Sequence, residues 1–131
     1  AAPAARIGIT PAKLGIVYSL FDTKLLVDLV GPARAKRILF TGALHDAAGA
    51  LAIGLIDEIA PDPRAAADTL ARAIAANAQH SVRSAKAIIR RILDGQADDD
   101  ATTLALFRDA FARPDFTEGV TAFREKRRPD F

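Results

Sequence analysis

Histidine, tyrosine and cysteine, three residue types that can carry proton transfer or metal chemistry, are scarce in this sequence. The 131 residues include two histidines, one tyrosine and no cysteine. The lack of cysteine excludes disulfides, thiol nucleophiles and thiolate metal sites. His45 and His80 are far apart and neither has a second ligand at helical spacing, so we expect no metal. His45 precedes Asp46 directly, but adjacent residues do not face each other on a helix, and Asp46 is better placed as a helix cap than as a catalytic partner.

A second group of candidate residues is basic. Arg83, Lys86 and Arg90 fall on one face of a predicted helix, with Arg91 beside them. Such a row is usually a solvated face, and the alternatives are contact with ligand phosphates or nonspecific contact with nucleic acid. The chain carries 18 basic and 16 acidic residues, which gives a net charge of only +2. This balance argues against nucleic acid as the main partner.

The composition predicts one globular domain. Half of the residues are hydrophobic, which is enough to bury a sizeable core. No apolar run approaches the roughly 20 residues that cross a bilayer, and residues 1–6 lack the apolar core of a signal peptide. We therefore expect a cytoplasmic protein with no membrane partner. Methionine is absent, even at position 1, which fits a fragment, a processed chain, or a chain whose initiator methionine before Ala1 was removed.

The elements that must position these residues are mostly helices. Residues 6–10 are expected to form a short strand that ends in a turn at Pro11 and Gly15. Helical spacing and breakers predict three helices and then an alternating strand, over residues 19–30, 33–40, 47–53 and 55–59. After Pro61-Asp-Pro63 we expect only helices, over residues 64–78, 82–93, 98–113 and 116–126. Asp46 and Ser81 are expected N-caps.

This order predicts an α/β fold class that begins with short strands and covering helices and continues as helices alone. We place the boundary after residue 61, with the core elements in residues 1–61 and a helical region in 62–131. Two of the later helices have apolar side chains at helical spacing, which we expect to be buried: Leu104, Phe107 and Phe111, then Val120 and Phe123.

Three stretches in a fixed order carry a resemblance to a known family. They are Ile7-Gly-Ile-Thr-Pro-Ala-Lys-Leu-Gly15, the segment 39–56 with its Thr-Gly and Gly-Leu pairs, and Ala122-Phe-Arg-Glu-Lys-Arg-Arg-Pro-Asp-Phe131. Together they resemble the C-terminal half of the enoyl-CoA hydratase/isomerase family, also called the crotonase family. The resemblance implies the C-terminal part of a crotonase-type (ββα spiral) fold. It also implies action on acyl-CoA thioesters by hydration, isomerisation or related enolate chemistry.

The resemblance also indicates which catalytic groups are missing. Family members use an oxyanion hole of backbone N–H groups and one or two carboxylates. The oxyanion donors and the first glutamate lie before the segment that matches Ile7, so we expect the N-terminal half to be lacking. The second glutamate belongs to a Gly-x-Pro-Glu-x-x-x-Gly segment, in which Pro11 takes its place and Ala12 follows. Proline supplies neither an acid nor a backbone donor, so we assign no catalytic residue.

Two nearby residues are candidates for a replacement acid. Residues 16–22 stand where many hydratases carry a Pro-Gly-x-Gly-Gly stretch, and they include Tyr18 and Asp22. The competing interpretation is that Tyr18 packs against apolar neighbours and that Asp22 is a surface residue in the first turn of a helix.

The ending resembles the family's Ala-Phe-x-Glu-Lys-Arg motif residue by residue, at Phe123 and Lys126. In relatives, the matching phenylalanine and lysine reach the adenine and phosphates of CoA, often in a neighbouring subunit. An aromatic face can cover a purine, and an ammonium pairs with phosphate as a point charge. The resemblance thus implies CoA as part of the substrate, no separate cofactor, and a homo-oligomer, either a trimer or a dimer of trimers. Without it, Phe123 would be a core residue and Lys126 a solvated one.

Three functions remain open from the sequence. The first is the C-terminal part of an acyl-CoA enzyme, whose 131 residues alone would be inactive. The second is a non-catalytic, truncated module that assembles through its helices or holds CoA. The third is a basic helical nucleic-acid binder, suggested by Arg83, Lys86, Arg90 and the cluster 124–128, although the chain lacks a recognition motif and interleaved aromatic residues.

Overall fold

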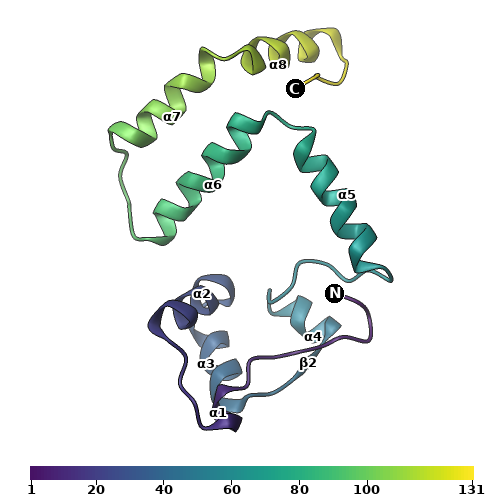
Figure 1. Cartoon of the computed structure of the whole chain (residues 1–131), viewed down its shortest axis with the longest axis vertical. Helices are drawn as coiled ribbons and strands as arrows, with labels where there is room; N and C mark the ends of the chain where they lie inside the picture. The colour runs from purple at the N-terminus through teal and green to yellow at the C-terminus, as the bar shows by residue number, and fades with distance from the viewer. The chain divides into compact units, whose positions relative to one another are not determined.

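The computed structural model describes all residues from 1 to 131. The chain forms two compact units, residues 1–67 and residues 68–131, and each is described by itself (Figure 1). The first unit holds a two-stranded sheet and four helices, and the second is helical throughout. None of the helices combines the length and the apolar character needed to cross a membrane.

The small sheet joins the start of the chain to its middle. Strand β1 (Arg6–Ile7) pairs antiparallel with β2 (His45–Asp46), with Arg6 opposite Asp46 and Ile7 opposite His45. Directly after β1, a Cβ on Gly8 would come within 2.7 Å of the Ala43 carbonyl oxygen, so the close approach of the two segments requires glycine there. The predicted first strand exists, and it is shorter than expected.

Four helices surround the core of this unit: α1 (Pro11–Leu14), α2 (Leu20–Val30), α3 (Pro32–Thr41) and α4 (Ala47–Ala52). Gly31, with φ of 79°, ends α2 and begins α3, and Pro32 occupies the first turn of α3, where a missing N–H costs nothing. The turn brings α2 against α3 and buries four apolar residues between them: Leu26, Val30, Ala35 and Ile38. This pair of helices matches the prediction.

Side-chain caps begin two of these helices, and the one at Asp46 was predicted. The Ser19 hydroxyl accepts a hydrogen bond from the Asp22 N–H at the start of α2. The Asp46 carboxylate accepts one from the Gly49 N–H at 2.7 Å and begins α4. Both interactions satisfy orphan donors of a first helical turn.

The predicted strand over residues 55–59 is wrong. This segment is irregular, and its backbone N–H and C=O groups bond to partners outside any sheet. The Leu55 N–H donates to the Ala50 carbonyl, and the terminal ammonium of Ala1 donates to the Glu58 carbonyl at 2.6 Å. The side chains do alternate in character, but a strand also needs a neighbouring strand to pair with.

Four helices follow: α5 (Pro63–Ala75), which runs across the boundary between the units, α6 (Gln79–Leu93), α7 (Ala101–Phe111) and α8 (Pro114–Glu125). Within the second unit, α7 packs against α6 and against α8. Ser81 was expected to cap α6, and this prediction is wrong because α6 begins two residues earlier. The Gln79 side chain instead donates to the Ile74 and Ala75 carbonyls and caps the end of α5.

The loop between α6 and α7 is held by polar contacts. Asp100 and Thr103 form a reciprocal capping box at the start of α7. The bond from the Thr103 N–H lowers the pKa of the Asp100 carboxyl below its ordinary value, and Arg91 adds an ion pair at 2.8 Å. The last of the three consecutive aspartates before this helix, Asp100, thus serves as its cap.

The second unit buries little apolar surface within this chain. Only Thr103 and Ala122 are buried there. Phe107 is 62% exposed, Phe111 is 54% exposed and Leu104 is 36% exposed. The expectation that these three side chains form a buried face is therefore wrong for a single chain. A row of this kind is a candidate interface, since large exposed apolar patches usually mark one.

Candidate functional site

Pro11 is a structural residue in this fold. It is buried at the first position of α1, and its carbonyl accepts hydrogen bonds from the N–H groups of Gly15 and Ile16. The next side chain, Ala12, is exposed and carries no polar atom. Neither Pro11 nor Ala12 therefore offers a group that could exchange a proton with a substrate.

The two candidates for a replacement acid flank a capping serine. Ser19 Oγ donates to Asp22 Oδ2 at 2.6 Å while it accepts from the Asp22 N–H at 3.1 Å. Tyr18 is 39% exposed, and none of the hydrogen bonds described joins its hydroxyl to Asp22. The structure thus gives Asp22 a local role at the helix start, and a role for either side chain in chemistry stays a prediction.

His45 and Asp46 do not form a catalytic pair. The Asp46 carboxylate is used by the Gly49 N–H, as the capping prediction required. The His45 ring nitrogen Nε2 is buried without a hydrogen-bond partner. No group of three or more histidine, cysteine or acidic side chains gathers in a way that could hold a metal ion.

The two residues predicted to contact CoA lie together at the end of α8. Phe123 is 85% exposed, so the alternative of a core phenylalanine is wrong. Lys126 ends the helix in the left-handed conformation, with φ of 55° and ψ of 35°, and it is the only residue other than glycine with a positive φ. The Arg127 N–H bonds the Ala122 carbonyl at 3.1 Å, which closes the helix end. An exposed aromatic ring thus stands one helical turn before an exposed ammonium.

A cluster that sequence reasoning missed holds this turn. Arg127 Nη1 and Nη2 donate to the two carboxylate oxygens of Glu118, and Arg127 Nε donates to Glu125 at 2.6 Å. Glu118 Oε1 also accepts from the Asp130 N–H at 2.8 Å. The bonds from Arg127, and next that from Asp130, lower the pKa of Glu118 from 4.5 to about 2, and Glu118 in turn raises the pKa of Arg127.

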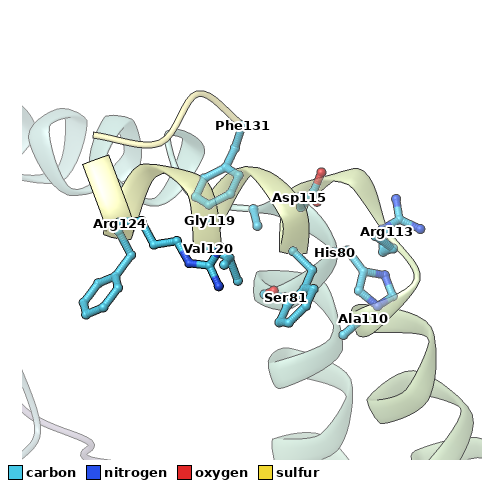
Figure 2. Close-up of a pocket in the computed structure, with 12 residues that line it drawn as sticks. His80, Ser81, Ala110, Arg113, Asp115, Gly119, Val120, Arg124 and Phe131 are labelled. Atoms are coloured by element: carbon cyan, nitrogen blue, oxygen red, sulfur yellow. The ribbon is translucent and has the colours of Figure 1, made fainter. Parts of the chain in front are cut away.

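An apolar cavity of about 460 Å³ opens beside α8 (Figure 2). Phe123 and Arg124 contribute to its lining, together with His80 and Ser81 from the start of α6, Ala110 from the end of α7 and Arg113, the N-cap of α8. The Phe131 ring, at the end of the chain, also lines the cavity and lies against Gly119, where an added Cβ would be 3.8 Å from Cζ. Residues of α8 therefore form part of the cavity wall.

The basic row on α6 is partly neutralised. Arg90 pairs with Asp94 at 3.0 Å, and Arg91 pairs with Asp100 across the loop. Neither guanidinium is presented as a bare cation. This pairing removes part of the motivation for a nucleic-acid interface on this helix.

Comparison with known proteins gives one consistent result. The family model for enoyl-CoA hydratase/isomerase matches residues 1–131. A Thermus thermophilus protein provisionally described as an enoyl-CoA hydratase is 40% identical, over 97% of this chain and 51% of its own length. The cyclohexa-1,5-dienecarbonyl-CoA hydratase of Thauera aromatica is 38% identical, over 97% of this chain and 50% of its own. This chain thus spans about half the length of these relatives.

Solved structures agree with the sequence matches. A structure of an enoyl-CoA hydratase/carnithine racemase from Magnetospirillum magneticum matches with a TM-score of 0.88 and 31% identity, over 99% of this chain and 49% of that one. A structure from Hyphomonas neptunium, provisionally described as an enoyl-CoA hydratase/isomerase family protein, gives 0.87 and 43%, over 97% and 49%. The fold described above therefore corresponds to about half of a crotonase-type chain.

Proposed function

This chain belongs to the enoyl-CoA hydratase/isomerase family, and we propose that it forms the CoA-binding half of a protein that acts on acyl-CoA thioesters. The reaction would be hydration, isomerisation or a related enolate reaction. The observation that carries the proposal is the pair at the end of α8, where an exposed Phe123 and a left-handed Lys126 stand one turn apart. A planar ring and an ammonium suit the adenine and the phosphates of CoA.

Proton transfer would depend on groups outside these residues. Pro11 is buried and has no acid, and Asp22 is engaged by Ser19. Donors for an oxyanion and a carboxylate would come from a segment equivalent to the other half of the relatives, which this chain spans only in part. We therefore assign to this chain the binding and presentation of the CoA moiety.

The similarity to relatives does not single out one acyl group. A relative named for the cyclohexadienecarbonyl thioester is 38% identical to this chain, and the crotonyl-CoA hydratase of Syntrophomonas wolfei is 33% identical. The two relatives are named for different acyl groups, although their sequence identities to this chain are similar, and both names contain CoA. We infer that the chain recognises CoA and leaves the acyl group to other parts of the site.

The second candidate is a CoA-binding or interaction module without catalysis. Pro11 favours it, because the position that carries a glutamate in the resembling hydratases here carries a buried ring. In either case we propose a homo-oligomer, a trimer or a dimer of trimers, in which the exposed row Leu104, Phe107 and Phe111 is covered by another subunit.

The test is a pair of measurements on the native-length protein. Calorimetry with CoA alone measures binding, and the loss of enoyl-thioester absorbance with crotonyl-CoA measures turnover. Binding with turnover supports the enzyme, and binding without turnover of any acyl-CoA supports the module. If the protein binds neither CoA nor acyl-CoA at millimolar concentration, the enzyme and the CoA-binding module are both wrong, and only an interaction module without CoA remains.

A further inference from the structure

The C-terminal run Lys126, Arg127 and Arg128 presents three adjacent cations that are alike in sequence and different in structure. Arg127 Nε donates one hydrogen bond, to Glu125, and Nη2 donates one, to Glu118. Nη1 donates two, to Glu118 and to the Arg128 carbonyl. A guanidinium has five N–H donors. Four of these are engaged inside the chain, so Arg127 has almost no capacity left for a ligand.

Lys126 differs in both respects. Its ammonium takes part in none of the five ion pairs of the structure. Its backbone occupies the left-handed region, where glycine is the usual residue at a helix end. A residue with a long side chain at such a position needs surroundings that hold it there, and strain of this kind is typical of functional sites.

Three residues, Glu118, Glu125 and Arg127, hold the chain on both sides of Lys126, and we call this set of contacts the clamp. Glu125 and Arg127, the residues before and after it, are joined to each other at 2.6 Å. Glu118, two turns earlier on α8, holds Arg127 by two parallel bonds and the tail by the Asp130 N–H. The turn is thus fixed to the helix from which Phe123 projects.

We propose that Glu118 and Arg127 are positioning residues of the CoA site, which hold Lys126 in its left-handed conformation so that its ammonium reaches a CoA phosphate. Arg127 itself does not bind the phosphate. This inference rests on the proposed CoA-binding function and adds to it a distinct role for two of the three cations. Of these three cations, only Lys126 contacts the ligand, and Arg127 acts through it.

The experiment is a double-mutant cycle on CoA affinity in the native-length protein. We expect Lys126→Ala to weaken binding about tenfold or more, the effect of losing one charge-assisted hydrogen bond. Glu118→Gln keeps the shape of the side chain and removes its charge, and we expect a loss of about threefold or more. In the Lys126→Ala background, Glu118→Gln should cause no further loss, because the clamp acts only through the lysine. Arg128→Ala is the matched control, a neighbouring cation outside the clamp.

Binding of 3′-dephospho-CoA, measured in the same cycle, identifies the phosphate that the lysine contacts. If Lys126→Ala has its full effect on CoA and none on the dephospho compound, the contact is the 3′-phosphate, and an equal effect on both indicates the diphosphate. Arg127→Lys keeps the charge and loses the two-pronged contact with Glu118, so it should behave as Glu118→Gln does and provides a second variant if that one fails to fold.

The outcomes distinguish a failure of the positioning role from a failure of the proposed CoA site. Unchanged CoA affinity in Glu118→Gln and Arg127→Lys, with a loss in Lys126→Ala, overturns the clamp and leaves the CoA site standing. Equal losses from Glu118→Gln with and without Lys126 also overturn it, since they indicate a general structural effect. If the unmodified protein does not bind CoA, the proposed function fails and the positioning role fails with it.

Discussion

Glu118 receives Arg127 through both of its carboxylate oxygens, at 2.6 Å from Nη1 and 3.0 Å from Nη2. The two residues are nine positions apart, and the contact spans the end of α8 and the turn after it. The pair is partly exposed, with side-chain exposures of 25% for Glu118 and 40% for Arg127. Because solvent screens such pairs, their geometric role outweighs their contribution to stability.

The stability of the chain should depend on pH through Glu118. Its pKa falls from 4.5 to about 2 on folding, so its stabilising contribution is complete above pH 4.5 and is lost as the pH falls towards 2. We expect the melting temperature to decrease across this interval. In Glu118→Gln the decrease should be smaller, because the group that titrates is gone. Thermal melts of both proteins from pH 6 to pH 2 measure this, and parallel curves would contradict the prediction.

Lys126→Gly should stabilise the protein while it weakens CoA binding. Glycine adopts positive φ without the steric cost that a side chain pays, which is about 1 kcal/mol, and Lys126 has φ of 55°. The variant should therefore melt at a higher temperature than the unmodified protein. Lys126→Ala is the control, because it removes the ammonium and keeps the Cβ, so it should lose affinity without gaining stability. A lower melting temperature for the glycine variant would show that the left-handed turn is not strained.

Gly8→Ala should destabilise the first unit. The new Cβ would stand 2.7 Å from the Ala43 carbonyl oxygen and 2.9 Å from Leu44 Cδ2, and such overpacking costs about 1–3 kcal/mol. Gly119→Ala is the comparison, because that glycine lies within α8 and its nearest neighbours would be at ordinary contact distance. There we expect no loss of stability. The urea concentration at the unfolding midpoint should therefore fall in Gly8→Ala and should not fall in Gly119→Ala. Equal midpoints would refute the predicted clash.

Parts of this structure that depend on neighbouring residues are predicted well by the sequence. The cap at Asp46 and the turn at Gly31-Pro32 each involve residues within one or two helical turns. The resemblance to the crotonase family, based on motifs of the same local kind, is confirmed by the family model over the whole chain.

Features that depend on distant partners are predicted less well. Residues 55–59 alternate as a strand does, yet they have no strand beside them, and Ala1 takes up the Glu58 carbonyl instead. Phe107 looked like a core residue because of its spacing, but burial depends on what covers the helix, and nothing within this chain does. The contact of Glu118 with Arg127 has no spacing signal, because it forms only after the chain turns back at Lys126.

The exposed face of α7 should mediate association. Phe107 and Phe111 stack edge to face, with centroids 5.2 Å apart, and both are more than half exposed. We expect an oligomer at micromolar concentration and a shift towards monomer in Phe107→Asp, which places a charge in the apolar row. Phe40→Asp, an equally drastic change at an exposed phenylalanine of the first unit, tests whether the effect is specific to α7. Sedimentation velocity resolves the species, and a monodisperse monomer of the unmodified protein would rule out the interface.

Residues 1–131 alone should not hydrate a short 2-enoyl-CoA, although the native-length protein is proposed to process an acyl-CoA. The turn at Pro11 presents no acid, the Asp22 carboxylate is engaged by Ser19, and the pair His45–Asp46 is not joined by a hydrogen bond. Loss of one oxyanion donor costs about 10²–10³ in rate, and each missing general acid or base costs about a further 10²–10⁴. Purified 1–131 and the native-length protein should be assayed side by side with crotonyl-CoA. Turnover by the short chain near the typical enzyme value of about 10 s⁻¹ would mean that Tyr18, Asp22 or another group here builds a catalytic site, and Tyr18→Phe and Asp22→Asn would then identify which side chain supplies the proton.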